Sequence, residues 1–262
     1  MIHFNLKKLS EIAPFVQMHE QTLHWFGLTD AELWIKWGRT SIYEYTGETV
    51  EYWHKSTKYN DYYLARFLED FTSLFAAINE PIPSQFYELA SDIQTLNAIG
   101  EYFIAIDSED ESLNDANYEK YEKCRSWINA RGMDSSHLIG GPYLCFFRCN
   151  DKIRIVWETE HTLENGLPIW TAKNGSIEMT YSDFKKEVIA FGESFFSEMD
   201  RQVKLAVEKE WGDITLDKIN LLKEHEERKN DFTTAVKLLN SKPTTNTNWS
   251  EILNLIEYHS LS

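Results

Sequence analysis

Basic residues are missing from a long segment of the chain. Between Phe67 and Glu119 there is no lysine or arginine, although the 262 residues hold 26 of them. The segment holds twelve acidic residues, so it carries most of the formal net charge of −16. This charge argues against nucleic-acid binding, which needs a basic footprint. It suits a protein that meets a basic partner, because opposite charges speed association.

Long apolar runs and paired cysteines are also scarce. No apolar run approaches the roughly 20 residues that span a bilayer. Residues 1–8 lack the apolar core of a signal peptide. The three cysteines, Cys124, Cys145 and Cys149, are odd in number and lack the spacing of a metal site. We therefore expect no membrane segment and a reduced, cytoplasmic compartment.

Several signatures of catalysis or metal binding do not occur. The chain has no Gly-rich phosphate loop and no Gly-x-Ser-x-Gly nucleophile elbow. No glycine follows the alternating acids at 107–111 where a calcium loop needs one. His225 has no second histidine four residues on, which excludes a zinc-protease helix. We expect His225 to be a core histidine, and we expect no metal and no cofactor.

Aromatic residues are abundant near the N-terminus. Residues 23–28 and 33–37 predict two strands joined by a turn at 29–32, with Asp30 capping the turn. Because side chains alternate along a strand, Leu33, Ile35 and Trp37 should face the core. Trp34 then faces the other way with charged neighbours. It is either covered by another element or exposed as a contact.

The rest of the chain alternates between strand and helix patterns. We expect strands at 2–6, 41–45, 137–139, 143–149, 152–159, 169–170 and 176–180, and a loop at 47–58. Helical spacing predicts helices at 60–78, 84–105 with a break at Gly100, 114–130, 182–210 and 217–240, and after Trp249.

Strands, helices, strands and helices in this order predict an α+β fold. We expect one antiparallel sheet built from the N-terminal and central strand groups and covered by long helices. Residues 1–262 would form a single domain. The alternative is two subdomains, 1–132 and 133–262.

Short motifs in a fixed order give the chain a resemblance. They are Leu23-His24-Trp25-Phe26-x-Leu28-Thr29-Asp30, Asp61-Tyr62-x-x-Ala65-Arg66-x-x-Glu69-Asp70, Gly141-Pro142, Pro168-Ile169-Trp170 and Glu224-His225-Glu226-Glu227-Arg228. Over most of its length the chain resembles an uncharacterised bacterial family of unknown function. It departs from the family pattern at Ala31 and Leu33, where the family has Gly and Tyr. The resemblance implies no activity.

The acid-only segment leads to the first functional hypothesis. Its densest part holds Asp107, Glu109, Asp110, Glu111, Asp115 and Glu119. These acids would bind a basic protein partner, with Trp53, Tyr59 and Tyr62 as aromatic anchors. The protein would then be a non-enzymatic binding protein, for instance an immunity protein that neutralises a basic toxin or nuclease domain. The competing interpretation is a solvated acidic loop that only aids solubility.

Two further hypotheses stay open. A hydrolase or small-ligand-binding protein could carry its site on the sheet, using His24, Asp134, His137 and Arg148. A deep polar pocket around these residues would favour this hypothesis. The third hypothesis is an interaction scaffold.

Overall fold

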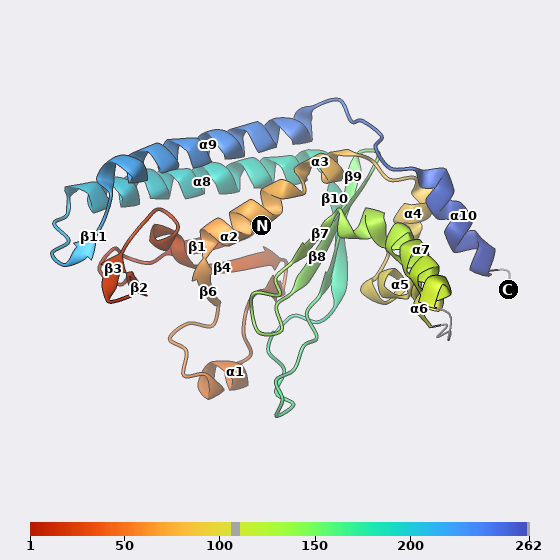
Figure 1. Cartoon of the computed structure of the whole chain (residues 1–262), viewed down its shortest axis with the longest axis horizontal. Coiled ribbons are helices and arrows are strands. Elements are labelled where there is room, and N and C mark those ends of the chain that lie inside the picture. Colours follow the sequence, from red (N-terminus) through yellow and green to blue (C-terminus); the bar gives the residue numbers. More distant parts are fainter. Residues whose placement is uncertain (106–110, 261–262) are drawn as a thin grey trace.

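Helices pack against antiparallel sheets in this protein, so the predicted α+β class is confirmed (Figure 1). The structure is a computed structural model, and it describes residues 1–105 and 111–260. Among these residues, no helix has both the length and the apolarity needed to cross a bilayer.

The first sheet is organised around one long strand. It contains β1 (Ile2–Leu6), β4 (Asp30–Trp37), β5 (Thr40–Ile42) and β6 (Asn60–Tyr63). β4 pairs with β1 along one edge and with β6 and β5 along the other, always antiparallel. Leu33 and Ile35 are buried as predicted. Trp34 faces outward, and the rings of His3 and Tyr59 cover it at centroid distances of 5.5 and 4.1 Å.

The predicted hairpin at 23–37 is wrong. Residues 24–29 form a tight turn that ends in the short 3₁₀ helix η1 (Gly27–Thr29), and the predicted turn residues belong largely to β4. The turn places both Trp25 and Leu28 in the core, which strand alternation would not allow. Asp30 caps no turn. It starts β4 and pairs with Lys7 at 2.9 Å.

The central strands form a second sheet of their own. It contains β7 (Gly132–Asp134), β8 (Tyr143–Cys149), β9 (Lys152–Glu158) and β10 (Gly175–Thr180), in the order β10-β9-β8-β7. A third, small sheet joins β2 (Phe15–Gln17), β3 (Glu20–Thr22) and β11 (Ile214–Thr215). The prediction of one sheet from both strand groups is therefore wrong. Residues 137–139 are not a strand, and residues 169–170 contribute only an isolated bridge between Trp170 and Tyr45.

Two long antiparallel helices lie over the first sheet (Figure 1). They are α8 (Tyr181–Glu208) and α9 (Lys218–Asn240), close to the predicted bounds. Beneath them lie α2 (Leu64–Ser73) and α3 (Phe75–Asn79), where one helix at 60–78 was predicted. That helix starts late because residues 60–63 pair with β4. The short α1 (Gly47–Tyr52) forms within the predicted loop.

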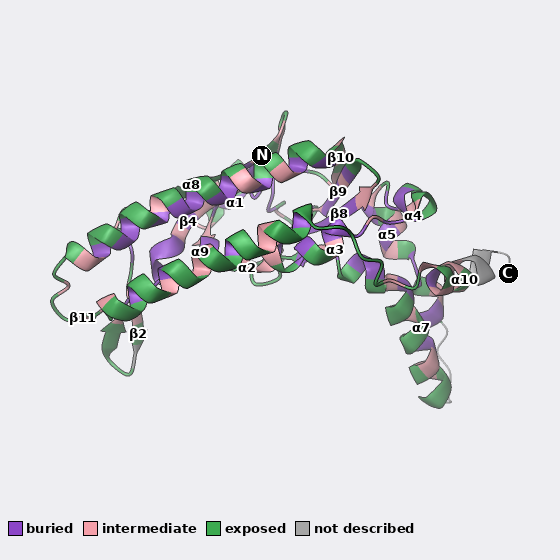
Figure 2. Cartoon of the chain, turned by 90° about the horizontal axis from the view of Figure 1, so that it is seen from above, coloured by how far each residue is buried: buried purple, intermediate pink, exposed green. Residues whose placement is uncertain are grey.

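Short helices cover the far side of the second sheet. The predicted helix at 84–105 is three helices, α4 (Ser84–Leu89), α5 (Ile93–Ala98) and α6 (Glu101–Ile104). Gly100, with a φ of +83°, breaks the chain where expected. The next helix along the chain is α7 (Glu111–Asn129), and α10 (Trp249–Ser260) packs on α7. Figure 2 shows α7 extending away from the sheets.

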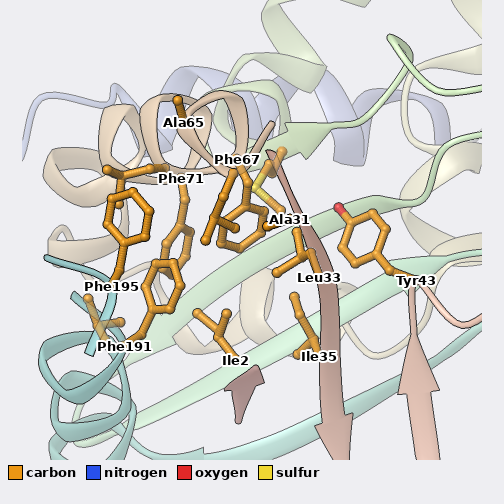
Figure 3. Close-up of a cluster of buried hydrophobic side chains, with 14 of the residues drawn as sticks. Ile2, Ala31, Leu33, Ile35, Tyr43, Ala65, Phe67, Phe71, Phe191 and Phe195 are labelled. Atoms are coloured by element: carbon orange, nitrogen blue, oxygen red, sulfur yellow. The ribbon is translucent and has the colours of Figure 1, made fainter. Parts of the chain in front are cut away.

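The second sheet is buried on both faces. Leu144 and Phe146 of β8 belong to the larger hydrophobic cluster, and Cys145 and Phe147 between them belong to the smaller one. This explains the unbroken apolar run in β8, since a strand covered on both faces need not alternate. Figure 3 shows part of the larger cluster, where side chains of the first sheet meet phenylalanines of α2 and α8. The larger cluster takes residues from both sides of residue 132.

Candidate functional site

The structure uses several acids of the acid-only segment internally. Glu69 pairs with Arg228, Asp70 with Arg66 at 2.9 Å and Glu80 with Arg131 at 3.3 Å. Asp92 caps α5 by accepting a hydrogen bond of 2.8 Å from the Thr95 amide. These four carboxylates are therefore committed to the fold.

The outward face of α7 carries acids that are not paired in this way. Glu111, Asp115 and Glu119 are exposed and follow one another at intervals of four residues, so they lie on one face of the helix. Glu122 is also exposed, three residues on, and extends the same face. No ion pair joins these four to a basic group among residues 1–105 and 111–260. Sequence reasoning missed Glu122 because it followed the acid-only segment instead of helical spacing. The predicted Asp107, Glu109 and Asp110 lie outside the described residues.

An aromatic side chain lies beside these acids. Tyr118 is 57% exposed, and it follows Glu111 by seven residues and precedes Glu122 by four. Those spacings place its ring on the same outward face. The opposite face of α7 is buried through Cys124, Trp127 and Ile128. The helix thus has one side in the core and one acidic side with a tyrosine toward solvent.

The predicted aromatic anchors lie elsewhere. Tyr59 stacks on Trp34, Tyr62 packs against the ring of His137 at 4.9 Å, and Trp53 meets Tyr45 edge-on at 5.6 Å. All three anchors are half-buried. They surround the first sheet, whereas α7 lies beyond the second sheet (Figure 1). The structure does not bring Trp53, Tyr59 and Tyr62 together with the acidic face.

Of the alternative ligand residues, His24 and His137 lie at the two ends of a row of rings. His24 stacks on Phe15 at 4.6 Å, and Tyr63 and Tyr62 continue the row to His137. Partial burial lowers the pKa of His137, and Arg66 lowers it further. The cavity beside His137 has a volume of only about 10 Å³. It has room for about one water molecule and not for a substrate.

The other two ligand residues lie at opposite ends of β8. In the antiparallel pairing of β7 with β8, Asp134 lies opposite Tyr143 at the start of β8. Arg148 follows Tyr143 by five residues, or about 17 Å along a strand. Arg148 binds the backbone and side-chain oxygens of Asn79, both at 2.7 Å. His24, Asp134, His137 and Arg148 therefore do not form one site.

Residues of three motifs meet in a network that is buried at Trp25 and His225 and partly exposed at its charged members. Trp25 Nε1 donates to His225 Nδ1 at 3.1 Å, and His225 Nε2 lies 2.7 Å from Asp200 Oδ1. Because the indole N–H can only donate, Nδ1 accepts and Nε2 carries the proton. Arg228 pairs with Glu69, and its guanidinium lies 5.2 Å from the centroid of the Trp25 ring. The network joins the turn before β4 to α2, α8 and α9.

This network assigns His225 a structural role. The side chain is buried and both ring nitrogens have partners, which confirms the expected core histidine. Burial disfavours the charged form of Asp200, but hydrogen bonds from His225 and Lys229 outweigh it and hold its pKa below the ordinary value. Trp25, Glu69, His225 and Arg228 of the motifs thus connect the turn before β4 with α2, α8 and α9.

Neither a metal site nor an activated thiol is evident in the described residues. No group of three or more His, Cys, Asp or Glu side chains is placed there to hold a metal ion. All three cysteines are free. Burial raises the pKa of Cys145 to about 12, so this thiol stays protonated at neutral pH.

Comparison with known proteins identifies one family. Residues 1–255 match the model of a family of unknown function (DUF5984). No curated protein and no solved structure matches the chain.

Proposed function

The chain belongs to this family of unknown function, and we propose that it is a non-enzymatic binding protein that takes a basic protein partner on α7. The observation that carries the proposal is the face formed by Glu111, Asp115, Glu119 and Glu122, which is exposed and forms no ion pair with a basic group among the described residues. Lys120 and Lys123 lie on the same helix, and Lys123 pairs with Glu251 instead. An immunity protein that neutralises a basic toxin or nuclease domain is one instance of this class. The three free cysteines support a cytoplasmic setting.

Like charges at this spacing work against the helix itself. Each like-charge pair at i,i+4 destabilises a helix by about 0.2–0.5 kcal/mol. Glu111 lies in the first turn of α7, where the helix dipole favours an acid, so the repulsion concerns mainly Asp115 and Glu119. A face that served only solubility could mix both signs at no such cost. A basic partner would remove the repulsion and would be attracted from a distance, which raises association rates by roughly 10- to 1,000-fold. Tyr118 supplies the kind of anchor on which binding energy concentrates.

The proposal is tested by capture of the partner. The full chain and a variant with Glu111→Gln, Asp115→Asn, Glu119→Gln and Glu122→Gln are immobilised and exposed to lysate of the source organism. A control variant removes four exposed acids elsewhere, Glu51, Glu164, Glu208 and Glu226, each changed to Gln. The two variants have equal net charge, so any difference in the protein that they capture depends on where the acids were removed.

The expected result is a basic protein that the wild type and the control capture and the α7 variant does not. Added salt should release it. Equal capture by all three chains, or loss from both variants alike, would overturn the role of α7. The narrower inhibitor hypothesis adds that the captured protein is an enzyme and that the wild-type chain suppresses its activity.

A further inference from the structure

The strand β1 forms an edge of the first sheet. It pairs with β4 along one side only, in an unbroken register that runs from Ile2 opposite Ile35 to Leu6 opposite Ala31. Its other side borders a groove of about 390 Å³ between β1 and α8. Figure 3 shows Ile2 of this strand between Ile35 of β4 and Phe191 of α8. A strand that ends a sheet in this way can pair with a further strand.

The free side of β1 presents backbone groups that have no partner. In an antiparallel pair, residues that exchange hydrogen bonds with the partner strand alternate with residues whose backbone groups point away from it. The amide of Lys7 donates to the carbonyl oxygen of Asp30 at 2.9 Å, which fixes this alternation along β1. The N–H and C=O groups of Ile2, Phe4 and Leu6 therefore point away from β4. In the described part of the chain they form no hydrogen bond.

This edge is uncharged in a strongly acidic protein. Residues 2–6 include no charged side chain and no proline, the two devices by which proteins commonly keep edge strands unpaired. Partial burial lowers the pKa of His3, so its neutral form predominates at pH 7. In the groove, Glu187 is bound by the amino group of Met1 at 2.7 Å, so the lining carries no net charge. By contrast, the edge strand β10 carries the charged Glu178.

These features favour a second copy of the chain as the source of the added strand. Two copies with a net charge of −16 each repel one another least where their surfaces are uncharged, and a basic partner would gain no attraction there. The three free residues are also symmetric about Phe4. When two copies of β1 pair antiparallel with Phe4 opposite Phe4, Ile2 of each copy lies opposite Leu6 of the other, and all three residues exchange hydrogen bonds. This pairing is self-complementary, as a twofold dimer requires.

The helix α8 leaves room beside the edge. Its side along the groove carries Glu187, Ala190 and Ser194, which are exposed and lie on one face of the helix at intervals of three and four residues. Ala190 and Ser194 have short side chains. Phe191 turns inward instead and meets the ring of Phe4 edge-on at 5.9 Å. In a twofold dimer, both copies of α8 would lie on the same face of the joined sheet.

We propose that β1 pairs with β1 of a second copy, in a symmetric antiparallel dimer whose first sheets join into one continuous sheet. The register places His3 of each copy opposite Asn5 of the other, and both side chains are exposed. The inference goes beyond the proposed function, because it does not involve α7. It adds that the protein presents two α7 faces at once.

Sedimentation equilibrium of the full chain at several concentrations measures the dissociation constant of the dimer. One variant combines His3→Lys with Asn5→Lys, which sets lysines opposite each other across the proposed interface. Within the chain, position 5 lies opposite Glu32, so a lysine there suits the fold. A charge-swap variant combines His3→Glu with Asn5→Lys, which sets opposite charges across the interface. The control combines His54→Lys with Asn230→Lys, the same changes at exposed positions outside β1.

The wild type should dimerise, and the double-lysine variant should raise the dissociation constant at least about tenfold, while the charge-swap variant and the control stay within about threefold. The added lysines reduce the overall repulsion between copies, so general charge cannot explain a weaker dimer. Circular dichroism checks that each variant keeps its fold.

A wild type that stays monomeric at every concentration would overturn the inference. A dimer that the double-lysine variant leaves unchanged, or one that is lost equally in both β1 variants, would do the same. The α7 variant should dimerise as the wild type does, so the two proposals can fail separately.

Discussion

Single side chains with buried charge set the strongest local constraints in this protein. Arg131 is 1% exposed, donates to the backbone oxygen of Trp127 at 3.0 Å and pairs with Glu80. Burial lowers the pKa of Arg131. Glu80 in turn accepts hydrogen bonds of 3.2 Å from the backbone amides of Asn246 and Thr247. This one carboxylate thus ties the segment before α10 to the body.

Replacing Arg131 should therefore be costly. Arg131→Met leaves Glu80 buried without its counter-charge, and breaking a buried pair from one side costs about 3–5 kcal/mol. Urea unfolding measures the free energy of unfolding. Arg39→Met is the control because Arg39 is exposed, and a change of less than about 0.5 kcal/mol is expected there. Equal effects at the two positions would contradict the role assigned to the pair.

The carboxylate of Asp92 should make the stability of the protein depend on pH. The hydrogen bond from the Thr95 amide lowers the pKa of Asp92. A lowered pKa adds stability that is present above the ordinary value, about 4, and is lost as the pH falls through the folded value. Asp92→Asn keeps the cap but does not titrate. The wild type should be more stable than this variant at pH 6, and the difference should shrink as the pH falls below about 4.

Urea titrations at pH 6, 4 and 3 check this expectation. Asp213→Asn in an exposed loop serves as the control. A difference between the wild type and Asp92→Asn that stays constant over this range would show that the carboxylate charge contributes nothing to the cap.

At the scale of elements, the spacing of apolar residues predicted long helices more accurately than short segments. The stripe of α8 predicted a helix at 182–210, and the structure has it at Tyr181–Glu208. The aromatic stretch 23–28 failed because turning the chain buries both Trp25 and Leu28, a tertiary gain that alternation does not encode. Residues 60–63 failed because their partner strand begins thirty residues earlier, at Asp30.

The residues of the candidate site could likewise be predicted only in part. Helical spacing within the sequence contains the acidic face of α7, including Glu122. The arginine partners of Glu69 and Glu80 are distant in sequence, at Arg228 and Arg131, so the sequence alone could not show that these two acids of the acid-only segment are paired internally. The register of β7 on β8 places Asp134 opposite Tyr143, and this separates Asp134 from Arg148 at the other end of β8.

The close packing of α8 against α9 can be tested by substitution of Gly192. Gly192→Ala should destabilise the protein by about 1–3 kcal/mol, because the methyl group would overlap the Phe232 ring. In an open helix the same change stabilises by about 0.5–1 kcal/mol. Gly47→Ala in α1 is the control, since no atom lies within 4 Å of the added methyl. Thermal unfolding of both variants should show opposite shifts, and a stabilised Gly192→Ala would refute the close packing.

For the whole molecule, the second sheet is the element that links its parts. Leu144 and Phe146 of β8 lie in the larger hydrophobic cluster, and Cys145 and Phe147 of the same strand lie in the smaller one. The helices α8 and α9 lie with the larger cluster, and α7 and α10 lie with the smaller. A single domain over residues 1–262 stays a prediction, and the shared sheet supports it. In this arrangement α7 extends from one end of the molecule (Figure 2).

The affinity for the captured partner at several salt concentrations tests the central claim most directly. Dissociation constants are measured at about 0.05, 0.15 and 0.5 M salt. Over this range the distance at which surface charges act falls as the salt concentration rises. Wild type and the Glu51, Glu164, Glu208 and Glu226 control should bind alike and weaken as salt rises. The α7 variant should bind at least about tenfold more weakly at low salt and depend less on salt. Equal constants for the two variants, or binding that salt does not change, would contradict an acidic docking face on α7.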